Sequence, residues 1–227
     1  MKVALILLFA CTFHASNAMT FKCAYAPYDN AYSGPGFQCF GSQVLVAGNS
    51  SHVTIITGSS TENLKVNSLV FNGGIAVCSE ITQVPKGLMS FFPKLDFLAL
   101  NNCGIETLRG DELVEYPNLK RFDIAGGNIQ YLPSQFFAST PLIEVVYFGN
   151  NKIKNVGVDL LINLKNLKIA MFYNQECIHS STFNNPPEYA VQNLIVELHT
   201  KCPDIEIKPQ CEVGNNDERI CALEKDN

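Results

Sequence analysis

One pattern recurs along the chain at a fixed period, so that Leu95, Leu119, Ile143 and Leu167 occupy equivalent positions in successive copies. Its first copy places five apolar residues and a cysteine at Leu95, Leu98, Leu100, Cys103, Ile105 and Leu108. The next two copies give Leu119, Phe122, Ile124, Gly127, Ile129 and Leu132, then Ile143, Val146, Phe148, Asn151, Ile153 and Val156. A fourth copy keeps Leu167, Ala170, Phe172, Gln175 and Cys177. An ungapped period of this length predicts a solenoid, in which each coil packs against its neighbours.

The spacing inside one copy predicts where its strand lies. Leu98 and Leu100 alternate, so both side chains point to the same side of a short strand. The residues after Leu108 return the chain to the next strand. Because one coil cannot bury its apolar side alone, the stacked coils must form a shared core.

The pattern L-x-x-L-x-L-x-x-N/C-x-L resembles the extracellular leucine-rich repeat family. The motifs F-P-x-L and Gln175-Glu176-Cys177-Ile178 are most similar to small secreted insect members with cysteine-stapled caps. The resemblance covers about residues 20–205. It implies an α/β solenoid, a horseshoe of 24-residue coils with short parallel strands on the concave face and disulfide-stapled caps at both ends. Members of this family are mostly binding proteins and not enzymes.

The ends of the chain predict export and capping. Lys2 precedes an apolar run too short to cross a bilayer, and Ser16-Asn17-Ala18 fits a cleavage site; a signal anchor is the alternative. Residues 53–56 predict an additional strand, and residues 188–200 an amphipathic helix. The predicted segments are a signal peptide at 1–18, an N-terminal cap at 19–52, a solenoid at 53–176, a C-terminal cap at 177–203 and a disulfide-stapled tail at 204–227.

Cysteine usage also indicates a secreted, extracellular protein. Cys11 leaves with the signal, and the remaining eight cysteines allow 105 pairings. Cys103 occupies the column of Gly127, Asn151 and Gln175, where a polar side chain normally bonds backbone groups. Cys78 lies beside that column in the preceding coil, about 4.8 Å away and inside the disulfide range. We therefore predict the pairs Cys78–Cys103, Cys23–Cys39, Cys177–Cys202 and Cys211–Cys221, with glycosylation at the sequon of Asn49.

Several classes of function are disfavoured. Without Lys2 the net charge changes from −5 to −6, and no basic run is present, which argues against nucleic acid and membrane insertion. The sequence holds no HExxH, GxSxG, CxxC or phosphate-binding motif, so we expect no enzyme, cofactor or metal. Zinc ligation by Cys177, His179 and Cys202 is an alternative with unusual spacing.

The outward strand positions predict the binding surface. They should be solvated and polar, yet several are apolar or aromatic, with a charged rim beside them. The predicted partner-binding residues are Phe97, Arg121, Asp123, Val145, Tyr147, Ile169, Met171 and Tyr173. The partner would be an extracellular protein or a second copy of this chain, in innate immunity or extracellular signalling. The alternatives are a matrix, adhesion or self-associating structural protein, or a terminal segment that covers this face.

Overall fold

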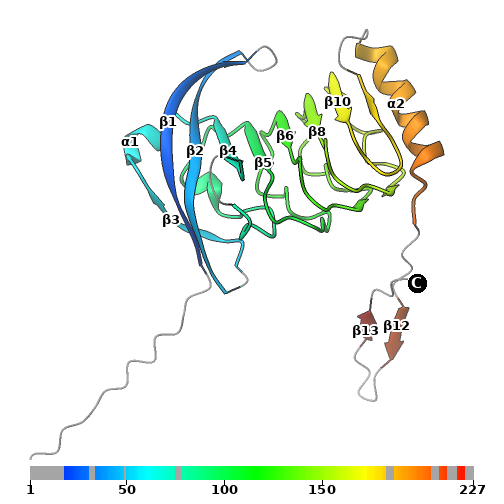
Figure 1. Ribbon diagram of the computed structural model, residues 1–227, viewed down its shortest axis with the longest axis horizontal. Helices are drawn as coiled ribbons and strands as arrows, with labels where there is room; N and C mark the ends of the chain where they lie inside the picture. Colours follow the sequence, from blue (N-terminus) through cyan, green and yellow to red (C-terminus); the bar gives the residue numbers. More distant parts are fainter. Residues whose placement is uncertain are drawn as a thin grey trace, which may run out of the picture.

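A computed structural model describes residues 18–30, 34–48, 50–74, 78–182, 187–205, 210–213 and 219–222. The predicted signal peptide, apart from Ala18, and the predicted glycosylation site Asn49 lie outside these residues. Among the described residues the main sheet has nine strands in the order β11-β10-β8-β6-β5-β4-β2-β1-β3. Figure 1 shows the central strands in a row, with a long hairpin at one end and a helix at the other.

The central strands are parallel and keep one register. They are β4 (Ser68–Asn72), β5 (Phe97–Asn101), β6 (Arg121–Asp123), β8 (Val145–Tyr147) and β10 (Ile169–Phe172). Phe97 pairs with Arg121, Arg121 with Val145 and Val145 with Ile169. The two members of each pair are separated by one sequence period, so the repeat and the strand register coincide. A second, two-stranded parallel sheet joins β7 (Tyr131–Leu132) to β9 (Asn155–Val156) on the return segments.

The repeated apolar positions form the core. All of those in the first three copies are buried, as are Leu167, Ala170 and Phe172 in the fourth; only Cys177 is partly buried. Phe122, Phe148 and Phe172 occupy successive coils and pack ring to ring, with centroid distances of 6.3 and 5.4 Å. Burying one such ring contributes about 1.5–3 kcal/mol, which explains why the pattern tolerates few polar exceptions. The predicted core is confirmed.

A long antiparallel hairpin occupies the N-terminal edge of the sheet. It consists of β1 (Ala18–Asn30) and β2 (Gly34–Ala47), and β2 pairs with β4 in parallel. The next strand, β3 (Val53–Thr57), pairs with β1 at the far edge of the sheet and not with a central strand. The solenoid boundary at residue 53 stays a prediction, and the row of parallel central strands begins with β4. A short helix, α1 (Ser60–Asn63), and a 3-10 turn, η1 (Leu88–Ser90), lie on the intervening connections.

The C-terminal end carries a strand, a helix and a separate hairpin. The strand β11 (Ser180–Ser181) pairs antiparallel with β10. The helix α2 (Pro187–Lys201) overlaps the predicted one and buries Val191, Leu194, Ile195 and Leu198. Beyond it, β12 (Gln210–Val213) pairs with β13 (Arg219–Ala222). Within the described part of the chain, no helix has the length and apolar character to span a bilayer.

Disulfides join neighbouring elements. The structure contains Cys23–Cys39 across the hairpin, Cys78–Cys103 between adjacent coils and Cys177–Cys202 between the last coil and the end of α2. These are three of the four predicted pairs. Cys211 and Cys221 are opposite each other in the β12–β13 register, but their side chains lie outside the described set, so that pair stays a prediction.

Later coils are linked by amides in the column that Cys103 occupies. The side chain of Asn151 is buried, and its Nδ2 donates to the carbonyl oxygens of Ile124 at 2.9 Å and Phe148 at 3.1 Å. Gln175 Nε2 donates to the carbonyl oxygens of Phe148 and Tyr173. The polar side chains expected in this column therefore satisfy backbone acceptors of the preceding coil.

Candidate partner-binding face

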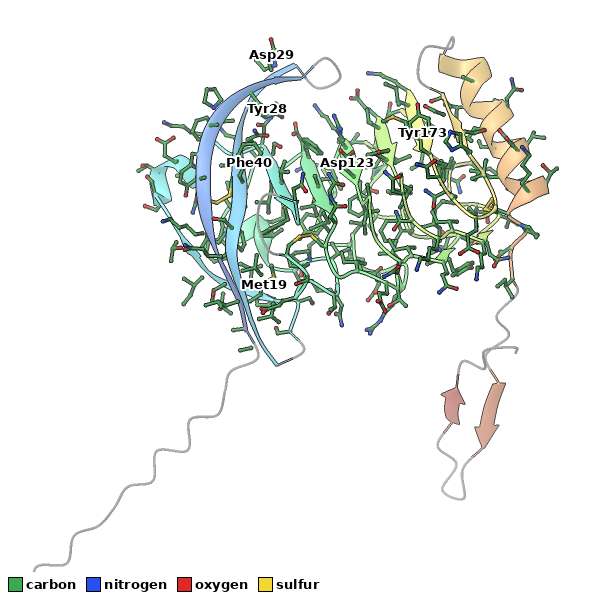
Figure 2. The ribbon with its side chains drawn as sticks, viewed as in Figure 1. Met19, Tyr28, Asp29, Phe40, Asp123 and Tyr173 are labelled. Atoms are coloured by element: carbon green, nitrogen blue, oxygen red, sulfur yellow. A yellow bond between two sulfur atoms is a disulfide. The ribbon has the colours of Figure 1, made fainter. Side chains whose placement is uncertain are left out.

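The side of the main sheet that points away from the core is the outer sheet face. Its residues alternate with the buried ones along each strand. The register aligns them into two rows across the strands: Gln38, Ser68, Phe97, Arg121, Val145 and Ile169 in the first, and Phe40, Val70, Ala99, Asp123, Tyr147 and Met171 in the second. Figure 2 places Phe40, Asp123 and Tyr173 along this sheet from the hairpin toward α2.

In the middle of this face three predicted binding residues contact each other. Arg121 donates from Nε to Asp123 Oδ1 at 2.9 Å and from Nη2 to Asp123 Oδ2 at 2.6 Å. The guanidinium carbon of Arg121 also lies 4.4 Å from the centre of the Phe97 ring. Burial raises the pKa of the Asp123 carboxyl, and the hydrogen bonds and charge of Arg121 oppose that rise. The charges of Arg121 and Asp123 therefore neutralise each other within the molecule.

The expectation that the outward positions are solvated is wrong for this part of the face. Phe97 is 6% exposed, Asp123 3% and Val145 3%. Phe97 is covered by Arg121 from the next strand, and Asp123 by the same guanidinium. Alternation decides the side to which a residue points, but the neighbouring side chains decide whether water reaches it.

The strands β8 and β10 differ, because their outward side chains other than Val145 remain partly exposed. The β8–β10 patch is defined as Tyr147, Ile169, Met171 and Tyr173. Tyr147 is opposite Met171, and Val145 beneath them pairs with Ile169. Burial, followed by the nearby charge of Asp123, raises the pKa of the Tyr147 hydroxyl, so this group stays neutral near neutral pH. Four of the eight predicted residues thus form one contiguous apolar and aromatic surface.

The charged residues beside this patch are partly paired with one another. Lys168 Nζ lies 2.5 Å from Glu144 Oε2 across adjacent strands. In the predicted rim of Lys120, Arg121 and Asp123, Arg121 is bonded to Asp123, whereas Lys120 is exposed. A partner would therefore meet mainly neutral groups on β8 and β10.

The sequence missed part of the outer sheet face. Phe40 and Val70 are partly exposed and extend the second row into the hairpin. Val70 could have been found, since it lies between the inward residues Leu69 and Phe71. Phe40 carried no local signal, because its place depends on the pairing of β2 with β4.

The described residues offer no candidate metal site. They contain no group of three or more His, Cys, Asp or Glu arranged to hold a metal ion. The zinc alternative is contradicted, because Cys177 and Cys202 are joined to each other. His179 instead accepts a hydrogen bond at Nδ1 from the backbone N–H of Asn174 at 3.0 Å.

Comparisons with known proteins add a structural likeness. No protein-family model matches the chain, and no curated protein matches it in sequence. The crystal structure of the APL1 leucine-rich repeat domain is similar to this chain, with 16% identity and a TM-score of 0.48. The match covers 69% of this chain and 36% of that one, so this chain spans little more than a third of its neighbour's length. The assignment as a solenoid rests on the register and core described above.

Proposed function

We propose that this protein is a secreted recognition module that binds another extracellular protein through the β8–β10 patch. The observation that carries the proposal is the contrast on one sheet face. Arg121 covers Phe97 and bonds Asp123, whereas the side chains of the patch remain partly exposed in the described part of the chain. Clustered aromatic and aliphatic side chains of this kind favour protein contacts, with Tyr as a preferred anchor.

Export is supported by the N-terminal sequence and by the disulfides. Lys2 and the apolar run that follows it lead to the small-x-small pattern Ser16-Asn17-Ala18, with cleavage expected after Ala18. Three disulfides join separate elements of the fold. Stable disulfides are typical of oxidising compartments outside the cytosol. N-terminal sequencing of the protein from culture medium should begin at Met19. Retention in the cell, or an intact N-terminus on the recovered protein, would contradict export by cleavage.

Recognition in innate immunity or extracellular signalling is the proposed biological setting. The outer sheet face offers contact area and uncharged polar groups, and the Asp123 carboxylate is buried against the Arg121 guanidinium. The proposal therefore assigns binding and not turnover to this face. Its competitor is self-association in a structural or adhesive protein, which would use the same patch.

A paired substitution separates these possibilities. We expect Ile169→Ser with Met171→Ser to weaken capture of the partner from native extracellular fluid by about tenfold or more, because central apolar anchors dominate such interfaces. The matched control is Val114→Ser with Ile162→Ser, since both residues are more than half exposed and lie outside the strands of the main sheet. Equal capture by both variants would refute the patch. A doubled light-scattering mass in the wild type that only the patch variant loses would identify a second copy as the partner.

A further inference from the structure

A group of uncharged polar and aromatic side chains lies where β8 and β10 end. The strand-end cluster is defined as Tyr147, Asn150, Tyr173, Asn174 and His179. Asn150 and Asn174 follow their strands at the same offset, one period apart, and both adopt a left-handed backbone with φ of 55° and 53°. Both are exposed. Asparagine tolerates the left-handed conformation, which accounts for its presence at both positions. The conformation does not account for amide groups that remain available to a ligand.

The two amides are held together and each retains an open group. Asn174 Nδ2 donates to Asn150 Oδ1 at 2.7 Å. In the described part of the chain, this contact leaves the Nδ2 group of Asn150 and the Oδ1 atom of Asn174 facing solvent without a protein partner. One donor and one acceptor are thereby fixed side by side.

Two aromatic rings and an imidazole flank these amides. Gly149 is the residue that makes this possible, because a side chain there would overlap the ring of Tyr147. Gly149 lies one period before Tyr173, so the Tyr147 ring extends toward the Tyr173 position. The Tyr173 ring centre is 5.6 Å from that of His179. Since His179 Nδ1 accepts the Asn174 N–H, the imidazole proton is on Nε2, which leaves a further donor.

The chemistry of the cluster selects a class of ligand. A phosphate or carboxylate would need a cation, but the five residues of the cluster include no lysine or arginine, and Lys154 on the neighbouring return segment is paired with Glu176 at 3.5 Å. A purely apolar ligand would desolvate the open amide groups without replacing their hydrogen bonds. A neutral sugar satisfies both demands, since its hydroxyls donate and accept while its C–H faces pack on aromatic rings.

We propose that the strand-end cluster binds a neutral pyranose residue of an oligosaccharide. Asn150 donates to a hydroxyl, Asn174 accepts from its neighbour, and Tyr147 and Tyr173 pack against the sugar ring. His179 Nε2–H supplies a third polar contact. This site shares Tyr147 and Tyr173 with the β8–β10 patch but not Ile169 and Met171, and it does not depend on the proposed protein partner.

The test uses glycine at both asparagines. Asn150→Gly with Asn174→Gly removes the amides while glycine accepts the left-handed backbone, as Gly126 already does at the same offset in the second coil. The matched control is Asn102→Gly, with φ of 55° at the equivalent position of the first coil, away from the tyrosines. The probes are immobilised oligosaccharides ending in glucose, mannose, galactose or N-acetylglucosamine, with sialylated counterparts. Affinity for the best probe is then measured by calorimetry.

The wild-type full-length protein should bind at least one neutral probe and gain nothing from sialylation. The double glycine variant should lose about tenfold or more, because two hydrogen bonds disappear, and Asn102→Gly should bind as the wild type does. Tyr173→Ala should also lose binding. Absence of wild-type binding to all neutral probes, or equal binding by the double variant, overturns the sugar site. The Ile169→Ser, Met171→Ser variant should keep sugar binding while it loses protein capture, so each proposal can fail alone.

Discussion

The two halves of the solenoid use the same repeat in different ways. In the N-terminal half, around β5 and β6, Arg121 bonds Asp123 and covers Phe97, and Cys103 is joined to Cys78. In the C-terminal half, around β8 and β10, the outward side chains other than Val145 are partly exposed, and the coils are joined by amides instead. Arg121, Asp123 and Cys103 of the first half therefore interact within the fold, whereas the outward side chains of the second half keep groups that can contact a ligand.

This difference teaches that a repeat can fix a scaffold without fixing its use. The buried columns are the same in both halves, and all the central strands share one register. Only the residues between the columns vary. We therefore expect substitutions in the first half to act mainly on stability and those on the outer face of the second half mainly on binding.

The largest effect is expected from Arg121→Ala. The arginine side chain is 13% exposed and that of Asp123 4%, so the variant leaves a buried carboxylate without its partner. We expect a loss of about 3–5 kcal/mol in the free energy of unfolding, measured with urea. Replacing both residues together, by Arg121→Met and Asp123→Leu, should cost much less because no charge stays buried. If the double variant were as unstable as the single one, packing and not charge would explain the loss.

The same variant carries a pH dependence of defined sign. Burial already raises the pKa of Asp123, and Arg121→Ala removes the two influences that lower it, so the pKa rises further. A carboxyl with a raised pKa binds its proton more tightly in the folded state than in the unfolded one. Stability therefore increases as the pH falls through the folded pKa, which lies above the ordinary Asp range. The deficit of the variant should be greatest at neutral pH and should shrink in mild acid.

The next effect is expected from the disulfides, which allow a comparison at equal loop length. Cys78–Cys103 and Cys177–Cys202 both have a sequence separation of 25 residues. The loop entropy of the unfolded chain is therefore equal, and removing either pair by double serine substitution should cost roughly 3–4 kcal/mol. Urea unfolding of both variants under non-reducing conditions measures this. A much larger loss of unfolding free energy for one pair would show that its disulfide also contributes contacts in the folded state of that half.

The sequence predicted the core because side-chain direction follows directly from the period. Leu98, Phe122 and Val146 are one column in sequence and one buried column in the structure. The Cys78–Cys103 pair was predicted from the stacking of adjacent coils, which brings Cys78, beside the ladder column, close to Cys103 in it. The repeat period and the stacking of adjacent coils were enough to predict both features.

Exposure and terminal topology depend on contacts that no period encodes. Phe97 has the alternation of a surface residue, but the Arg121 side chain one coil later covers it. Val53–Thr57 reads as the start of the solenoid, but the strand pairs with β1 beyond the hairpin. The hairpin itself is an antiparallel chain reversal, which leaves no repeat to extrapolate. The strand-end asparagines are visible in the sequence, but their mutual hydrogen bond requires the left-handed turns.

The smallest effect in this series tests the amide link of the C-terminal half. Asn151 and Asn150 are neighbours, but Asn151 is buried and bonds carbonyl oxygens of two coils, whereas Asn150 is exposed. Asn151→Ala removes the side-chain donor of the Ile124 carbonyl, whereas the Phe148 carbonyl keeps Gln175 Nε2, and the variant should cost about 1–3 kcal/mol by urea unfolding. Asn150→Gly should change stability by at most about 0.5 kcal/mol, because its contact is solvated and glycine accepts its backbone. If Asn150→Gly destabilised the chain as much as Asn151→Ala did, the strand-end amides would be part of the scaffold. The C-terminal half would then hold no more free groups than the N-terminal half.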